Sequence, residues 1–259
     1  MGLLLAFAFL CTRVSKSTTQ DREKLRRLLE YIHGSIDRDY TLGADDMGIM
    51  MTWVDAAFAV HPDMKSHAGG VISFGRCGIV CKSTKQKLNT KSSTEAEFVG
   101  ASDYLPSNMV WVKFFLEAQG YSMESNVLGQ DNKSAIRLGK NGRMSTVSKS
   151  QHIDIRYFWI KDRLKKGTIT VEHCPTLEML ADFFTKPLQG HLFRRFQDVL
   201  LGSLHVNTLV APMMESIKER VEGKRISPHK TAATGVVNTG TGTLKDVSTG
   251  IKSSQRSER

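Results

Sequence analysis

The sequence is poor in the features of disulfide-bonded, zinc-binding and calcium-binding proteins. Its 259 residues include only four cysteines, too few and too scattered for a disulfide framework. Cys77 and Cys81 stand four apart without a Cys-x-x-Cys motif or a nearby pair of histidines, which favours buried free thiols over zinc ligands. The acidic loop at 34–48 lacks the ligand spacing and the final glutamate of an EF-hand.

A membrane anchor and a signal peptide are also disfavoured. The apolar run Met1–Leu10 is too short to cross a bilayer. No basic residue precedes it, and no convincing small-residue cleavage site follows it. The better interpretation is a buried helix from a larger parent domain, cut off at its start. Without a convincing targeting signal, the cytoplasm is the default location, and no membrane partner is expected.

The chain is basic, with a net charge of +10 and a pI near 9.5, which suits a polyanionic partner. Two basic runs contain no acid, one from Lys82 to Lys91 and one from Lys133 to Lys149. Either run alone is explained by a solvated face. Both lie beside acidic positions described below, and that adjacency favours nucleic acid as the partner.

Hydrophobic patterning predicts a mixed α/β domain. The predicted strands are 49–60, 69–74, 77–81, 126–129 and 168–173, the second and third forming a hairpin through Gly75–Arg76. The predicted helices are 17–33, 94–104 (capped by Ser93 or Thr94 and broken at Pro106), 108–118, one starting at 134–138, 151–165, 177–184, and one or two turns at 192–200. Three antiparallel strands followed by two strands joined through helices predict a mixed sheet with helices packed on it.

Four acids stand in apolar or strand-end settings: Asp55 in a strand, Glu97 in the first turns of a helix, Asp131 after a strand, and Asp182 in an apolar helix. Each alone is explained by a cap, a turn or an exposed helix position. Burying all four is costly unless a cation binds them. Together they would supply the oxygen ligands for two hard cations such as Mg²⁺, which catalyse displacement at phosphate.

The resemblance to a known family rests on five motifs, in this order along the chain: Asp55, Ser92–Glu97, Gln130–Ile136, His152–Arg156 and Leu180–Pro187. Their order and spacing resemble the RNase H domain of copia-type LTR retrotransposon polyproteins over about residues 50–200. Residues 5–48 look like the end of the reverse transcriptase region that precedes that domain. Met1 would then be a truncated start within a longer ancestral frame.

The resemblance implies an α/β, RNase H-like fold: a five-stranded mixed sheet with helices on both faces. Residues 1–48 would be a remnant of the C-terminal or connection region of a reverse transcriptase, and 49–202 the RNase H-like domain. Residues 203–259 are expected to be a disordered basic tail, because Thr231–Arg259 is rich in Gly, Ser, Thr and Lys with little to bury.

The implied activity is hydrolysis of the RNA strand of an RNA/DNA hybrid with two Mg²⁺ ions, Mn²⁺ being a possible substitute. The partners would be the hybrid and the reverse transcriptase portion of the parent polyprotein. Glu97 is preferred to Glu95 because the catalytic Glu of the family precedes an apolar pair, here Phe98–Val99. The implied catalytic and metal-binding residues are Asp55, Glu97, Asp131 and Asp182. The candidate nucleic-acid contacts are Lys82, Lys85, Lys87, Asn89, Lys91, Ser92, Thr94, Asn132 and Lys133.

Departures from the family leave alternatives open. Ala57 stands where the family commonly has a second Asp, which we do not regard as a ligand. His173 lies in the neighbourhood where cellular relatives carry a mobile His, but copia-type sequences generally do without that residue. His152 and Asp154 suit capping or packing better than catalysis. A catalytically weak relic that only binds nucleic acid is the alternative function. An integrase or transposase is disfavoured by the Ser92–Glu97 helix. A retroelement particle or the nucleus are alternative locations.

Overall fold

The computed structural model describes residues 3–141 and 151–226, and in these ranges the chain is built around one central sheet. Strand β2 lies in the middle, antiparallel to β3 on one side and parallel to β6 on the other. The outer strands are β5, antiparallel to β3, and β7, parallel to β6. In spatial order the strands are β5 (Val80–Lys85), β3 (His67–Ser73), β2 (Ile49–Ala57), β6 (Ser125–Gln130) and β7 (Thr170–His173).

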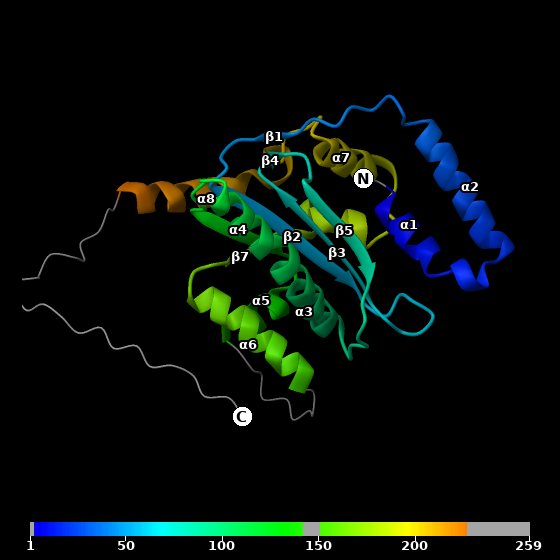
Figure 1. Ribbon diagram of the computed structural model, residues 1–259, viewed down its shortest axis with the longest axis horizontal. Coiled ribbons are helices and arrows are strands. Elements are labelled where there is room, and N and C mark those ends of the chain that lie inside the picture. Colours follow the sequence, from blue (N-terminus) through cyan, green and yellow to red (C-terminus); the bar gives the residue numbers. More distant parts are fainter. Residues whose placement is uncertain (1–2, 142–150, 227–259) are drawn as a thin grey trace, which may run out of the picture.

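Helices cover both faces of this sheet (Figure 1), so the predicted five-stranded mixed sheet with helices on both faces is confirmed. The α-helices are α1 (Leu4–Cys11), α2 (Thr19–His33), α3 (Ser93–Tyr104), α4 (Trp111–Ala118), α5 (Lys133–Asn141), α6 (Gln151–Lys165), α7 (Gly190–Leu201) and α8 (Asn207–Ile226). The shorter helical turns are η1 (Val14–Lys16), η2 (Leu105–Val110), η3 (Thr176–Glu178) and η4 (Leu180–Phe184).

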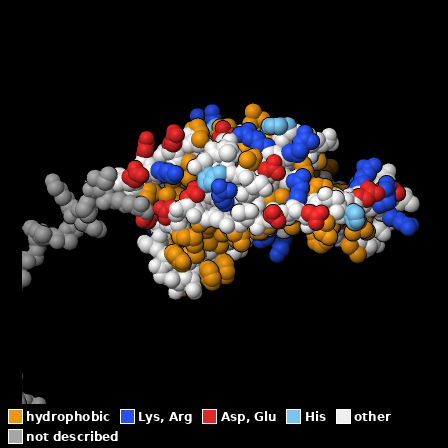
Figure 2. All heavy atoms as spheres, turned by 90° about the horizontal axis from the view of Figure 1, so that it is seen from above, with side chains coloured by type: hydrophobic (Ala, Val, Ile, Leu, Met, Phe, Trp, Pro, Cys, Tyr) orange, Lys and Arg blue, Asp and Glu red, His pale blue; other side chains and the backbone are white. Residues whose placement is uncertain are grey.

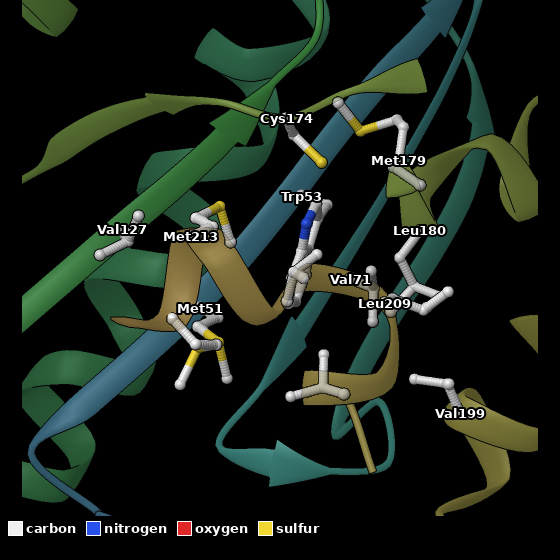
Figure 3. Close-up of a cluster of buried hydrophobic side chains, with 14 of the residues drawn as sticks. Met51, Trp53, Val71, Val127, Cys174, Met179, Leu180, Val199, Leu209 and Met213 are labelled. Atoms are coloured by element: carbon white, nitrogen blue, oxygen red, sulfur yellow. The ribbon is translucent and has the colours of Figure 1, made fainter. Parts of the chain in front are cut away.

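The side chains of β2 alternate between two hydrophobic cores, one on each face of the sheet. Met50 and Val54 pack with the apolar side chains of α3, η2 and α4. Met51 and Trp53 pack on the opposite face, where Trp53 lies among Cys174, which follows β7, and residues from η4 and α8 (Figure 3). Asp55 stands two residues after Trp53 in the strand, so its side chain lies on the same face of the sheet as those of Met51 and Trp53.

The C-terminal part of the described chain contradicts the expected tail. Residues 207–226 form helix α8 rather than disordered chain. The physical reason is burial: the buried side chains of α8 complete the core around Trp53 (Figure 3). They are Leu209, Val210, Met213, Met214, Ile217 and Val221. The Thr231–Arg259 segment of the predicted tail lies outside the described residues.

The predicted hairpin turn at Gly75–Arg76 is wrong because of the local backbone conformation. Gly75–Arg76 is not a hairpin turn but strand β4, which pairs with β1 (Gly43–Ala44). Gly75 and Cys77 have φ angles of 127° and 62°, and such positive values interrupt an extended strand. The third strand of the main sheet therefore starts at Val80.

Pro106 does not end a helix as predicted. It lies at the start of η2, a π-helical segment that joins α3 to α4 without an intervening loop. A proline removes one backbone donor, and the wider π turn is a known way to accommodate such an interruption. Residues 177–184, predicted as one helix, form η3 and η4, both of the tighter 3-10 type.

The N-terminal helices lie beside the sheet at the β5 side (Figure 1). A capping box begins α2: Asp21 N–H donates to the Thr18 hydroxyl, and Thr18 N–H donates to the Asp21 carboxylate. The expectation that the first helix is buried is wrong, because α1 has no fully buried residue and only Leu4 packs against the core. Within the described ranges, no helix combines the length and apolarity needed to cross a bilayer.

Candidate active site

Asp55 lies near the end of β2 and is 1% exposed, facing the same side of the sheet as Trp53. It pairs across the sheet with Gly69 of β3. A Cβ atom at Gly69 would come within 2.6 Å of the Phe184 Cβ and 2.8 Å of the Thr185 Cγ2. The missing side chain therefore lets the end of η4 approach the sheet, and the Thr185 hydroxyl donates a hydrogen bond to the Asp55 carboxylate.

Asp131 follows the end of β6, directly beside the end of β2. Because β2 and β6 are parallel, their carboxyl ends meet at the same edge of the sheet, where ligands of open α/β sheets bind. Gln130 fixes the loop: its Oε1 accepts hydrogen bonds from the N–H groups of Asp131 at 2.8 Å and Asn132 at 3.2 Å.

Asp182 lies in η4 and is 3% exposed. The ligand oxygens of Asp55, Asp131 and Asp182 all lie within 4.8 Å of one another. The Lys186 Nζ lies 2.8 Å from the Asp182 Oδ1 and 3.8 Å from the Asp55 Oδ1. Three acids from distant parts of the chain thus form one cluster, which we call the acid cluster, with Lys186 at its side.

Glu97 of α3 reaches the cluster from the helical side and is 6% exposed. Its carboxyl group lies close enough to Asp55 for the charge of that acid to act on it, and the Gln130 Nε2 lies 3.5 Å from its Oε2. Glu95 instead lies on the surface, where its side chain accepts a hydrogen bond from the Lys91 N–H. Of the two glutamates, Glu97 is therefore the one beside the acid cluster.

Burial and mutual repulsion raise the pKa of three of these acids. Burial, followed by the charges of Asp55 and Asp131, raises the pKa of Glu97 to about 10. Burial and the charge of Asp55 raise the pKa of Asp182 to about 7, although Lys186 opposes the shift. The pKa of Asp131 is also raised, first by burial and then by Asp55. Crowding of like charges in a buried pocket is costly without a compensating cation.

The chemistry of the donor atoms fits a hard divalent cation. The acid cluster offers only carboxylate oxygens, the ligands that Mg²⁺ and Mn²⁺ prefer. Glu97 is placed to add a fourth carboxylate from its position beside Asp55.

A basic groove lies between strands β3 and β5 of the sheet and helices α3 and α6. Lys82, Lys85 and Lys87 line it together with Arg156 of α6, and its volume is about 470 Å³. Gly69, the partner of Asp55 in the sheet, also lines this groove. Three of the predicted nucleic-acid lysines therefore share one groove, which the strand partner of Asp55 also lines.

Several of the other predicted nucleic-acid residues have local structural contacts. Ser92 caps α3 by accepting a hydrogen bond from the Glu95 N–H at 3.2 Å. Asn132 accepts hydrogen bonds from the first turn of α5, and the Asn89 side chain donates to the Asp63 carbonyl. Within the groove, Lys85 pairs with Asp63 at 2.7 Å. Thr94 and Lys133 lie in the first turns of α3 and α5.

Sequence reasoning missed three residues at the site: Lys186 and Thr185, which contact the acids, and Arg156, which lines the groove. All three belong to the quoted motifs, and the four-residue spacing of Asp182 and Lys186 was a usable signal. His173, at the end of β7, is exposed and pairs in the sheet with Gln130. The side chains of His152 and Asp154 lie outside the described residues.

Comparison with known proteins identifies relatives by sequence. The chain is 30% identical over 186 residues to the retrovirus-related Pol polyprotein from transposon TNT 1-94 of Nicotiana tabacum, covering 71% of this chain and 14% of that protein. It is also 30% identical over 181 residues to the retrovirus-related Pol polyprotein from transposon RE1 of Arabidopsis thaliana, covering 69% of this chain and 12% of that protein. The chain thus spans only about one seventh of these curated relatives. No family model matches it.

The solved structures with partial similarity include two ribonucleases H1. LC11-RNase H1, isolated from compost by a metagenomic approach, is 13% identical, with 52% of this chain and 91% of that chain covered and a TM-score of 0.39. RNase H1 from the halophilic archaeon Halobacterium salinarum NRC-1 is 11% identical, with 52% of this chain and 91% of that chain covered and a TM-score of 0.38. LC11-RNase H1 has also been solved in complex with an RNA/DNA hybrid; there the identity is 12%, the shares are 52% and 92%, and the TM-score is 0.34.

Proposed function

From the similarity of this chain to a region of copia-type retrotransposon Pol polyproteins, we propose that it is an RNase H domain that hydrolyses the RNA strand of RNA/DNA hybrids. The observation that carries the proposal is the acid cluster, in which three buried or half-buried carboxylates lie within 4.8 Å of one another. Such a cluster is unfavourable in a protein that has no use for a cation.

The residues have separate roles in this proposal. Asp55, Asp131 and Asp182, with Glu97 beside them, would hold two Mg²⁺ ions, which would activate a water and stabilise the leaving 3′ oxygen. The Thr185 hydroxyl orients the Asp55 carboxylate, and Gln130 orients the backbone of Asp131. These contacts fix the carboxylates before substrate arrives, which is the usual requirement for efficient catalysis.

The basic groove would bind the phosphates of the hybrid. Its lysines and Arg156 share the groove with Gly69, which pairs with Asp55 in the sheet, so a backbone bound there would lie beside the strand that carries the first acid. Selection of RNA on the cleaved strand would rest on contacts to 2′-hydroxyl groups in the wide minor groove. Phosphate contacts supply affinity, whereas the 2′-hydroxyl contacts supply discrimination.

The parent polyprotein is the proposed second partner. Residues 1–48 would be the end of its reverse transcriptase region, and the RNase H-like unit, predicted at 49–202, would extend to include α8, whose side chains complete its core. The exposed aromatic side chains of α4 (Trp111, Phe114 and Phe115) would suit packing against a neighbouring domain. Figure 2 shows one face of the molecule, on which hydrophobic side chains gather in a patch among charged ones.

A relic that binds nucleic acid without cutting it is the second candidate. The position of Lys186 favours it, because an ammonium group within 2.8 Å of Asp182 already neutralises part of the cluster. A domain with this arrangement would keep the basic groove and lose turnover.

Cleavage of a labelled RNA/DNA hybrid separates the two candidates. Duplex DNA and duplex RNA serve as control substrates, each with Mg²⁺ or Mn²⁺. We expect metal-dependent cutting of only the RNA strand of the hybrid, lost in Asp131→Asn and retained in Asp162→Asn, which changes an exposed aspartate of α6. Folded protein that binds the hybrid without cutting it would refute the enzyme and support the relic.

A further inference from the structure

Lys186 is the only basic residue that the described contacts place against the acid cluster. Its ammonium group contacts two of the three acids, Asp182 at 2.8 Å and Asp55 at 3.8 Å. The side chains of these two acids are only 5% and 2% exposed, whereas that of Lys186 is 39% exposed. The lysine therefore reaches from a half-exposed position into a buried pair of negative charges.

The local fold explains how Lys186 reaches this position. The backbone N–H of Lys186 donates to the carbonyl of Asp182 at 2.8 Å, so the two residues share one helical turn and the lysine side chain lies over the acid. The close approach of Thr185 to Gly69 brings the same turn down onto β3, beside Asp55 of β2. The turn that supplies the third acid of the cluster thus also supplies its positive charge.

A second ion pair in the molecule provides a comparison. Lys166 and Asp162 also stand four residues apart and are separated by 2.8 Å, but their side chains are 62% and 47% exposed. Such exposed pairs contribute little to stability. Lys186 differs in that its partners are buried and that a second carboxylate lies within reach.

We propose that Lys186 is an internal counter-ion of the acid cluster that competes with divalent cations for Asp55 and Asp182, and so lowers the metal affinity of the site. The inference rests on the proposed function in so far as the cluster binds metal. Lys186 is a positioning residue in this proposal: it holds the two acids together without metal, and its ammonium group moves away when a divalent ion binds them. A unit charge about 5 Å from a divalent ion weakens binding by a factor on the order of ten even in a water-like dielectric.

The first test is the affinity of the purified chain for Mn²⁺, measured from the electron paramagnetic resonance signal of the free ion. We expect Lys186→Met to bind Mn²⁺ on the order of tenfold more tightly than the wild type. The Mn²⁺ affinity of Lys186→Arg, which keeps the charge, should stay close to that of the wild type. Lys166→Met is the matched control for losing a lysine. Equal or weaker binding by Lys186→Met would overturn the proposal.

The second test uses the wild-type protein and so does not depend on a variant folding. The amines are methylated with formaldehyde and cyanoborohydride, and the rate at each lysine is measured by mass spectrometry. Saturating Mn²⁺ should raise the rate at Lys186 severalfold, because its ammonium is released from the carboxylates, and leave Lys166 unchanged. Mn²⁺ binding without a change at Lys186 would refute the displacement.

Neither readout requires hybrid cleavage. A chain that binds Mn²⁺ as described and cuts nothing would refute the proposed enzyme while leaving the role of Lys186 intact. Conversely, metal-dependent cleavage with unchanged Mn²⁺ affinity in Lys186→Met would refute only the counter-ion.

Discussion

Acidification should destabilise this protein through His67, a β3 residue that is 2% exposed. Its Nε2 lies 2.8 Å from the Ser83 hydroxyl, which itself donates to the Phe184 carbonyl at 2.7 Å. The Ser83 oxygen must therefore accept from His67 Nε2–H, and the His67 Nδ1 lies 3.1 Å from the His61 Nε2. Burial, assisted by His61, lowers the pKa of His67 to about 4, so the ring is neutral in the folded protein.

The sign and size of the effect follow from linkage. Between the unfolded pKa of 6.5 and the folded pKa of about 4, the unfolded chain binds more protons at this residue than the folded one. The stabilisation of the folded protein that comes from keeping His67 neutral is therefore fully present above pH 6.5 and is lost as the pH falls towards 4. Over this whole window the loss amounts to about 3 kcal/mol, of which about 2 kcal/mol falls between pH 7.5 and pH 5.

Urea unfolding at pH 7.5 and pH 5 of the wild type and of His67→Asn measures this contribution. The acids of the site titrate in both proteins and cancel in the comparison, so the variant should lose about 2 kcal/mol less than the wild type on acidification. The same pH dependence in both proteins would refute the reasoning. That outcome would mean that the buried ring accepts a proton without opening the structure.

Three further changes test the packing and hydrogen bonds. Gly70→Ala would place a Cβ atom 2.5 Å from the Tyr104 ring, and urea unfolding should show a loss of about 1–3 kcal/mol; unchanged stability would mean that the ring moves freely. Thr185→Val removes the hydroxyl that donates to buried Asp55, so thermal unfolding in EDTA should show a loss of about 1–3 kcal/mol, whereas no loss would place another donor there. Ser92→Ala should cost about 1 kcal/mol as a lost helix cap and leave hybrid affinity unchanged; weaker hybrid binding would instead restore Ser92 as a nucleic-acid contact.

The parts of the fold that sequence predicted well have strong local signals. The nearly continuous apolar run at Ile49–Ala57 is the central strand β2, and the apolar stretch ending at Gln130 is β6. The Asp55 position stood out because an acid inside such a run needs a reason to be buried. Asp131 stood out because it follows a strand end.

The missed features depend on contacts distant in sequence or on unusual backbone conformation. The apolar residues Leu209, Met213, Ile217 and Val221 of α8 stand four apart, a helical spacing that the sequence prediction overlooked, but that they complete the core around Trp53 is decided by the other elements. At Pro106 the backbone changes from α-helical to π-helical hydrogen bonding, whereas the usual rule expects a proline to end the helix. Lys186 looked like an ordinary surface lysine until the fold placed Asp55 beside it.

The acid cluster combines side chains from β2, from the loop after β6 and from η4, so it depends on contacts between segments that are far apart in the sequence. Contacts of high sequence separation form slowly, because the entropy of closing long loops is lost before the contacts stabilise the chain. During synthesis, β2 and β3 can pair early, but the third acid emerges only after β7, and α8 later still. A growing chain therefore carries no assembled acid cluster until nearly the whole domain has left the ribosome, and the site becomes competent as one of the last events of folding.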